Sequence, residues 1–189
     1  MRKAETEPSQ DYPALVVGIG TGFNACPVLD VDGTIYCQHV EVGHTSLPSN
    51  LANALERDNI NPKDFPTIES LFSGPGFETF CQKVLNNNNI SGREVLNEYG
   101  HAEISDNIVH RYGELIGWLL RDLTLAYMPT GGIYCTGGMA RQILARAAQE
   151  CSAILAPHHE IIALKTPPIQ FIKDDFAALY GCANFRNNP

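Results

Sequence analysis

The sequence has no cluster of basic residues: 13 Lys and Arg stand against 21 Asp and Glu, giving a formal net charge of −8. A nucleic acid or an anionic membrane surface is normally recognised by a basic patch, so we expect neither as a partner. The chain also lacks an apolar run long enough to cross a bilayer, and it shows no secretory signal. These absences together predict a cytoplasmic protein.

The six cysteines do not show the spacing of a metal-binding or redox-active motif. They are scattered, no CxxC occurs, and none lies in a cluster with histidine. A structural zinc site is therefore not expected, and we assign no metal-binding residues. A chain of 189 residues can bury a core without disulfides, so the cysteines are predicted to be free thiols in a reducing compartment.

Two common phosphate-binding motifs are missing as well. No GxxxxGK[ST] loop occurs, and GIGTG (residues 18–22) has the wrong spacing for a dinucleotide fingerprint. It is followed by a strand and an Asp32-Gly33 hairpin signal, whereas the fingerprint requires a helix. What remains is a hairpin with Gly20, Thr21 and Gly22 at its tip, which could direct N–H groups and a hydroxyl at a phosphate. A plain tight turn is the alternative.

The elements present predict one α/β domain. Strands are expected at residues 14–19, 23–30 and 34–40, which form an antiparallel portion, and later at 132–136 and 168–173. Apolar residues recur every three or four positions over 103–127, which predicts a long helix. Further helices are expected at 51–57, at 91–98, from Met139 and from Asp174. Such an order favours a mixed sheet with helices packed on it, covering residues 14–189 after a disordered leader at 1–13.

A second glycine pair lies in YCTGGMARQIL (134–144), where a strand ends and a helix begins. Gly137 and Gly138 would bring the backbone close to whatever lies at the carboxyl end of that strand. Open α/β sheets bind ligands there. A packing point that needs small residues explains the pair equally well.

Three polar residues are candidates for ligand binding. Glu41 and His44 follow the third expected strand, and Glu69 lies in the largely apolar segment IESLF. A carboxylate in such a setting is costly unless it finds partners. Two carboxylates and an imidazole could accept hydrogen bonds from a polyhydroxylated ligand. The alternatives are surface charges or turn caps.

Five segments together resemble the larger domain of the bacterial-type glucokinases, which belong to the actin-like sugar kinases. VVGIGTGFNA resembles their second phosphate motif, and VEVGHTSLP resembles the EGGH sugar signature. IESLFSGPGF, TGGIYCTGGMARQIL and PIQFIKDDFAALYGCANF resemble the Glu-x-x-LSGPGL segment, the adenosine motif and the closing strand and helix. Each match is weak alone, but five in the correct order are specific.

The resemblance implies a ribonuclease-H-like (actin-like ATPase) domain and an ATP:glucose phosphotransferase that uses ATP and Mg²⁺. The residues that match would then have set roles. Glu41, His44 and Glu69 would bind sugar hydroxyls. Gly20, Thr21 and Gly22 would contact the ATP phosphates, and Gly137 and Gly138 the adenosine.

The sequence also departs from the family pattern. Val42 and Asn24 stand where the family has glycines. Asparagine tolerates the left-handed backbone conformation, so we expect the change at position 24 to have little effect on the turn. The zinc-binding cysteine motif of the related repressor–kinase family is missing, which argues against that branch. DxGGT and the Asn-Asp pair, whose aspartate is the family's general base, do not occur in these 189 residues.

The missing motifs lead us to expect that the small domain is absent and that the chain alone is inactive, with no catalytic residue of its own. One alternative is a non-catalytic sugar- or nucleotide-binding regulatory module. The small domain on another polypeptide is one expected partner, and a homodimer formed through the apolar surface that would face that domain is another.

Overall fold

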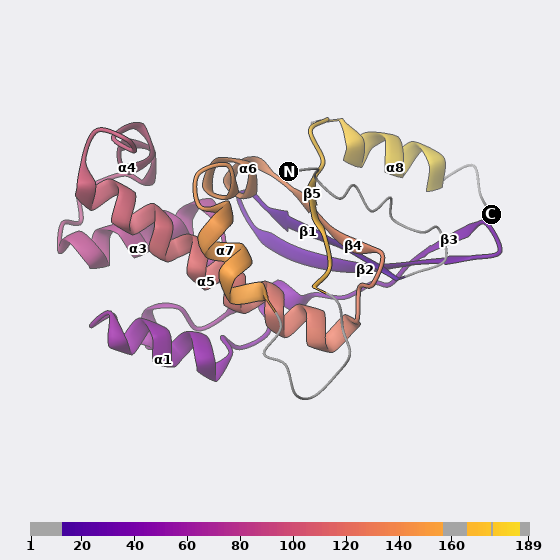
Figure 1. Ribbon diagram of the computed structural model, residues 1–189, viewed down its shortest axis with the longest axis horizontal. Coiled ribbons are helices and arrows are strands. Elements are labelled where there is room, and N and C mark those ends of the chain that lie inside the picture. Colours follow the sequence, from indigo (N-terminus) through magenta and orange to yellow (C-terminus); the bar gives the residue numbers. More distant parts are fainter. Residues whose placement is uncertain (1–12, 157–165, 175, 186–189) are drawn as a thin grey trace, which may run out of the picture.

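The structure is a computed structural model, and it describes residues 13–156, 166–174 and 176–185. Its strands form one five-stranded sheet in the order β3-β2-β1-β4-β5 (Figure 1). Their bounds are β1 Ala14–Ile19, β2 Phe23–Val31, β3 Thr34–Cys37, β4 Gly132–Thr136 and β5 Ile169–Phe171. The first three strands pair antiparallel, whereas β4 runs parallel to β1 and β5 parallel to β4. The predicted mixed sheet with an antiparallel portion is confirmed.

The helices vary from one turn to seven turns. Their bounds are α1 Ser49–Arg57, α2 Ile68–Leu71, α3 Gly74–Leu85, α4 Gly92–Asn97, α5 Glu103–Tyr127, α6 Gly138–Leu144, α7 Ala148–Leu155 and α8 Ala177–Phe185, with single 3₁₀ turns η1 at Val42–His44 and η2 at Pro62–Asp64. In Figure 1, α1, α3, α4, α5 and α7 gather to the left of and below the strands, and α8 lies above the strands.

The sheet is apolar on one face. Leu15, Val17 and Ile19 alternate along β1 and are buried, and Ile133 and Cys135 continue the same face on β4. The residues between them are only half-buried. One face of the sheet therefore carries the core, and the other is covered less completely.

The long helix α5 has the predicted bounds and is the centre of the core. Its apolar face packs on α7 at unusually close range because Gly113 and Gly117 leave room for it. A Cβ added at Gly113 would lie 2.4 Å from the Cβ of Ala147, and one at Gly117 would lie 2.7 Å from the carbonyl oxygen of Cys151. Small residues at these two positions set the distance between the helices.

Several predicted bounds need correction. The helix expected from Met139 is interrupted after Leu144, and the chain continues as α7 from Ala148. The sequence there has strong helix propensity, but the buried Ala147 packs against Gly113, and tertiary contact overrides propensity. The strand expected over 34–40 ends at Cys37, the strand expected over 168–173 is β5, and the last helix begins at Ala177. The leader predicted at residues 1–13 lies, apart from Pro13, outside the described residues.

No helix in the part of the chain that the structure describes has both the length and the apolar character needed to cross a bilayer.

Candidate functional site

The first glycine segment forms the tip of the β1–β2 hairpin. Ile19 pairs with Phe23, and Gly20 donates its N–H to the carbonyl of Gly22 at 2.9 Å. Thr21 is exposed, and the N–H groups of Thr21 and Gly22 make no hydrogen bond to any described residue. A Cβ added at Gly20 would meet nothing within 4 Å. The tip therefore offers two unused backbone donors and a hydroxyl beside open space.

The second glycine segment touches the first. Gly137 follows β4, and β4 lies beside β1 in the sheet. Its φ is +96°, and an added Cβ would lie 2.3 Å from the carbonyl oxygen of Ile19 and 3.2 Å from the N atom of Gly20. Gly138 begins α6, is exposed, and has nothing within 4 Å of an added Cβ. The two motifs, more than a hundred residues apart in sequence, thus meet at one end of the sheet.

A third segment, SGPGF (residues 73–77), contacts the hairpin tip. The sequence motifs predict no site residue in it. Gly74 donates its N–H to the carbonyl of Gly20 at 2.7 Å. Ser73, which is buried, caps α3 by accepting the N–H of Gly76 at 3.1 Å. The sequence shows the glycines of SGPGF, but only the fold shows that Gly74 supports the hairpin tip at Gly20, which we call the phosphate-type turn.

Glu69 is fixed by the backbone of β2. Its Oε2 accepts the N–H of Phe23 at 2.8 Å, and an added Cβ at Gly22 would lie 2.5 Å from the same oxygen. The expected need of this half-buried carboxylate for a partner is confirmed. Its other oxygen, Oε1, makes no hydrogen bond to a described residue.

Glu41 precedes the 3₁₀ turn η1, His44 is its last residue, and both are exposed. The turn packs against the start of β2: an added Cβ at Gly43 would lie 2.2 Å from the carbonyl oxygen of Phe23 and 3.4 Å from the Cβ of Glu69. The structure therefore brings the segment that carries Glu41 and His44 next to Glu69. It shows no hydrogen bond among the three side chains themselves.

Asn24 has a role that sequence reasoning missed. It lies in regular β2, and its φ is not positive, so tolerance of left-handed backbone is not what it supplies. Instead its Nδ2 donates to the carbonyl of Val40 at 2.8 Å, and its Oδ1 accepts the N–H of Val42 at 3.2 Å. The spacing in the sequence gave no signal for this contact.

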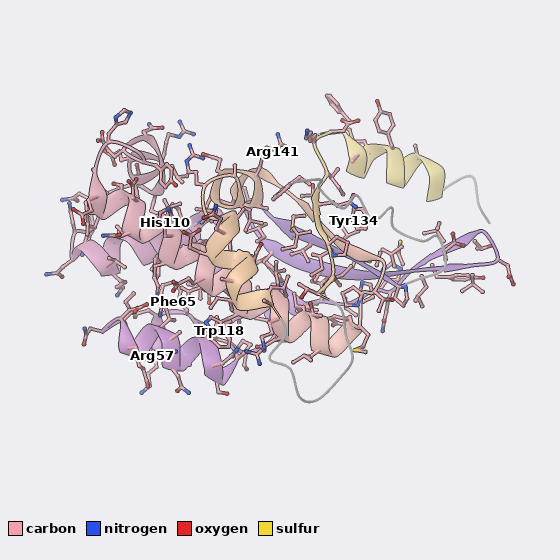
Figure 2. All side chains as sticks on the ribbon, in the orientation of Figure 1. Arg57, Phe65, His110, Trp118, Tyr134 and Arg141 are labelled. Atoms are coloured by element: carbon pink, nitrogen blue, oxygen red, sulfur yellow. The ribbon has the colours of Figure 1, made fainter. Side chains whose placement is uncertain are left out.

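Elsewhere, a hollow of about 530 Å³ lies between α1 and α5, lined by Asn50, Asn53, Glu56, Arg57 and Trp118. Figure 2 shows Arg57 and Trp118 on the side of the molecule away from Arg141 of α6. This hollow is separate from the glycine segments and holds none of the predicted site residues. Among the residues described, no group of three or more His, Cys, Asp or Glu side chains is arranged to hold a metal ion.

Comparison with protein families gives one model that matches residues 2–188, and its description is "Glucokinase". A glucokinase-like protein of Xylella fastidiosa is 28% identical over 146 residues, which are 71% of this chain and 43% of that protein. A glucokinase of a Chelativorans species is 34% identical over 94 residues, 46% of this chain and 26% of that protein. The chain thus spans less than half the length of these relatives.

Solved structures share the fold at low identity. The glucokinase of an Antarctic psychrotroph superposes with a TM-score of 0.73 at 22% identity, over 100% of this chain and 61% of that one. A glucokinase of Streptomyces griseus, solved in complex with glucose and AMPPNP, gives a TM-score of 0.68 at 13% identity, over 95% of this chain and 62% of the other. The predicted ribonuclease-H-like (actin-like ATPase) fold is confirmed.

Proposed function

Because the chain belongs to the glucokinase family, we propose that it supplies the nucleotide- and sugar-facing wall of a hexose kinase. The complete enzyme would transfer the γ-phosphoryl group of ATP to the 6-hydroxyl of glucose. The observation that supports this most is the contact between Gly137 and the Ile19–Gly20 peptide. This contact between the hairpin tip (Gly20 to Gly22) and the paired glycines Gly137 and Gly138 supports the proposal that one nucleotide binds both segments.

The hairpin tip suits the ATP phosphates. The free N–H groups of Thr21 and Gly22 and the Thr21 hydroxyl are hydrogen-bond donors of the kind that phosphate oxygens accept. Open space at Gly20 and Gly138 leaves room for the nucleotide, with Gly137 and Gly138 against the adenosine. Mg²⁺ would arrive with ATP, where it neutralises charge on the phosphates. The described residues supply no cluster of ligands for it.

The sugar would bind beside this turn. The free Oε1 of Glu69 and the carboxylate of Glu41 can accept hydrogen bonds from hydroxyl groups, and His44 can accept or donate one. Glu69 also holds Phe23 at the start of β2, directly after the phosphate-type turn. One carboxylate would thereby link the position of the sugar to that of the phosphates.

The proton acceptor for the sugar hydroxyl would lie outside these 189 residues. Phosphoryl transfer depends mainly on positioning and charge, but the attacking hydroxyl must still lose its proton. The DxGGT and Asn-Asp motifs do not occur in this sequence. A single wall also leaves the reacting groups open to water. We therefore expect the 189-residue chain alone to have negligible turnover.

A coupled assay of glucose-dependent ADP release tests this proposal. The purified chain should show no turnover above background, and activity should appear when a polypeptide that carries DxGGT and Asn-Asp is added. Glucose phosphorylation at ordinary enzyme rates by the chain alone would refute the proposal that the proton acceptor for the sugar hydroxyl lies outside these 189 residues. Failure of any such polypeptide to restore activity, with ligand still bound, would favour the second candidate.

The second candidate is a non-catalytic binding module. Val42 in place of glycine in the sugar signature is the observation that favours it, because a side chain there would be a departure from the family's sugar contact. Calorimetry distinguishes it from the kinase when combined with the assay: such a module binds glucose or ATP–Mg²⁺ but gives no activity with any partner.

A further inference from the structure

The two residues that replace family glycines in the phosphate and sugar motifs are in contact with each other. Asn24, in β2, stands at the end of the phosphate-type motif VVGIGTGFNA, and Val42 lies within the sugar-type signature VEVGHTSLP. The N–H of Val42 donates to Oδ1 of Asn24 at 3.2 Å. Two departures from the motifs that the sequence resembles are therefore joined by one hydrogen bond.

The Asn24 side chain holds the backbone on both sides of Glu41. Its Nδ2 donates to the carbonyl of Val40 at 2.8 Å, while its Oδ1 accepts from Val42. The same Oδ1 also accepts the N–H of Ala25 at 2.9 Å. Only the amide oxygen can accept two N–H groups and only the nitrogen can donate, so these contacts determine the orientation of the amide.

The turn after Glu41 is also held by the burial of the Val42 side chain. The Val42 side chain is 8% exposed and belongs to the hydrophobic core. Valine has far less backbone freedom than glycine, so the substitution stiffens the turn. The next residue, Gly43, lies against the carbonyl of Phe23 with no space for a side chain. The core below and Asn24 beside it therefore fix the segment that carries Glu41.

We propose that Asn24 is a positioning residue for sugar binding: it sets the direction in which Glu41 presents its carboxylate to a hexose hydroxyl. The inference rests on the proposed function, in which Glu41 is a sugar ligand. Glu41 is exposed and its side chain does not cap the turn, so its direction depends on its backbone. A backbone fixed before the ligand arrives lowers the cost of ordering the site on binding.

Amide hydrogen exchange on the 189-residue chain tests the two contacts without any ligand. Asn24→Ala removes both of them, whereas Asn24→Asp keeps an acceptor for Val42 and loses the donor to Val40. Exchange at Val42 should be about fivefold faster in Asn24→Ala and close to the unsubstituted rate in Asn24→Asp. Asn53→Ala, an exposed asparagine on α1, is the matched control. Equal exchange at Val42 in the unsubstituted chain and Asn24→Ala would overturn the inference.

Glucose calorimetry on the same proteins tests the consequence for binding. The dissociation constant should rise about fivefold in Asn24→Ala, and Asn53→Ala should leave it unchanged. An unchanged constant in Asn24→Ala would overturn the positioning role. If the unsubstituted chain bound no glucose, the proposed sugar site would fall and the positioning role with it. The exchange result would still decide whether Asn24 fixes the turn, so the two failures can be distinguished.

Discussion

Gly137 lies against Ile19 so closely that a Cβ on the glycine would be 2.3 Å from the isoleucine carbonyl oxygen. The carbonyl oxygen belongs to the backbone, and the backbone also fixes the position of a Cβ, so rotation about side-chain bonds cannot relieve the overlap. The φ of +96° is also unfavourable for any residue with a side chain. Gly137→Ala should therefore lower the free energy of unfolding by about 2–4 kcal/mol, measured by denaturant titration.

The matched variant is Gly138→Ala, one residue later. It meets no atom within 4 Å and has no positive φ, so it should leave stability within about 0.5 kcal/mol of the unsubstituted chain. A side chain there would protrude into the space proposed for adenosine. Equal stability loss in the two variants would mean that the contact with Ile19 is not what requires glycine at position 137.

Glu69 has a structural and a proposed ligand-binding role, and two substitutions separate them. Glu69→Ala leaves the N–H of Phe23 without its acceptor and should cost about 1–2 kcal/mol of stability. Glu69→Gln can still accept that N–H through its amide oxygen, so its thermal unfolding should be nearly unchanged. Its glucose affinity should fall, because a charged acceptor for a hydroxyl is replaced by a neutral one. If Glu69→Gln bound glucose as well as the unsubstituted chain, Glu69 would be a structural residue alone.

The cysteines should differ sharply in reactivity. Burial raises the pKa of Cys81, Cys135 and Cys151 to about 12 each, so these thiols stay protonated far above neutral pH. Cys37 is exposed. Among the cysteines whose side chains the structure describes, alkylation of the folded chain at about pH 8, followed by peptide mass spectrometry, should modify Cys37 first and leave Cys81, Cys135 and Cys151 intact until denaturant is added. Raising the pH to about 9 should not change this order. Early modification of Cys135 would contradict the burial of β4.

We expect the chain to self-associate through its exposed apolar side chains. Large apolar side chains are more than half exposed at Ile35 and Tyr36 on β3 and at Leu179 and Tyr180 on α8. Exposed apolar surface of this kind often marks an interface. Sedimentation velocity of the purified chain should therefore show a dimer at high concentration that dissociates on dilution. A single monomer species at every concentration would contradict the homodimer.

The sequence predicted those elements whose signals are local. The apolar period of α5 and the run of β4 gave their bounds, and the Asp32-Gly33 turn gave the β2–β3 hairpin. The interruption between α6 and α7 was missed because its cause, the contact of Ala147 with Gly113, joins residues far apart in the chain. Propensity alone cannot report such a contact.

The candidate site, too, was predicted only where its signals are local in the sequence. Motifs identified the two glycine segments and Glu69 as candidates, but only the fold showed that Gly137 touches the hairpin tip. The sequence does not predict the side-chain contacts of Asn24, because their partners, Val40 and Val42, are 16 and 18 residues away and leave no local signal.

The central claim is that the hairpin tip and the paired glycines bind one nucleotide together. Titration of the ¹⁵N-labelled chain with ATP–Mg²⁺ tests it directly, by following the amide resonances of Thr21, Gly22 and Gly138. The account predicts that all three shift with one common dissociation constant, while residues around Trp118 in the α1–α5 hollow stay unchanged. Shifts confined to that hollow, or none at millimolar nucleotide, would contradict it.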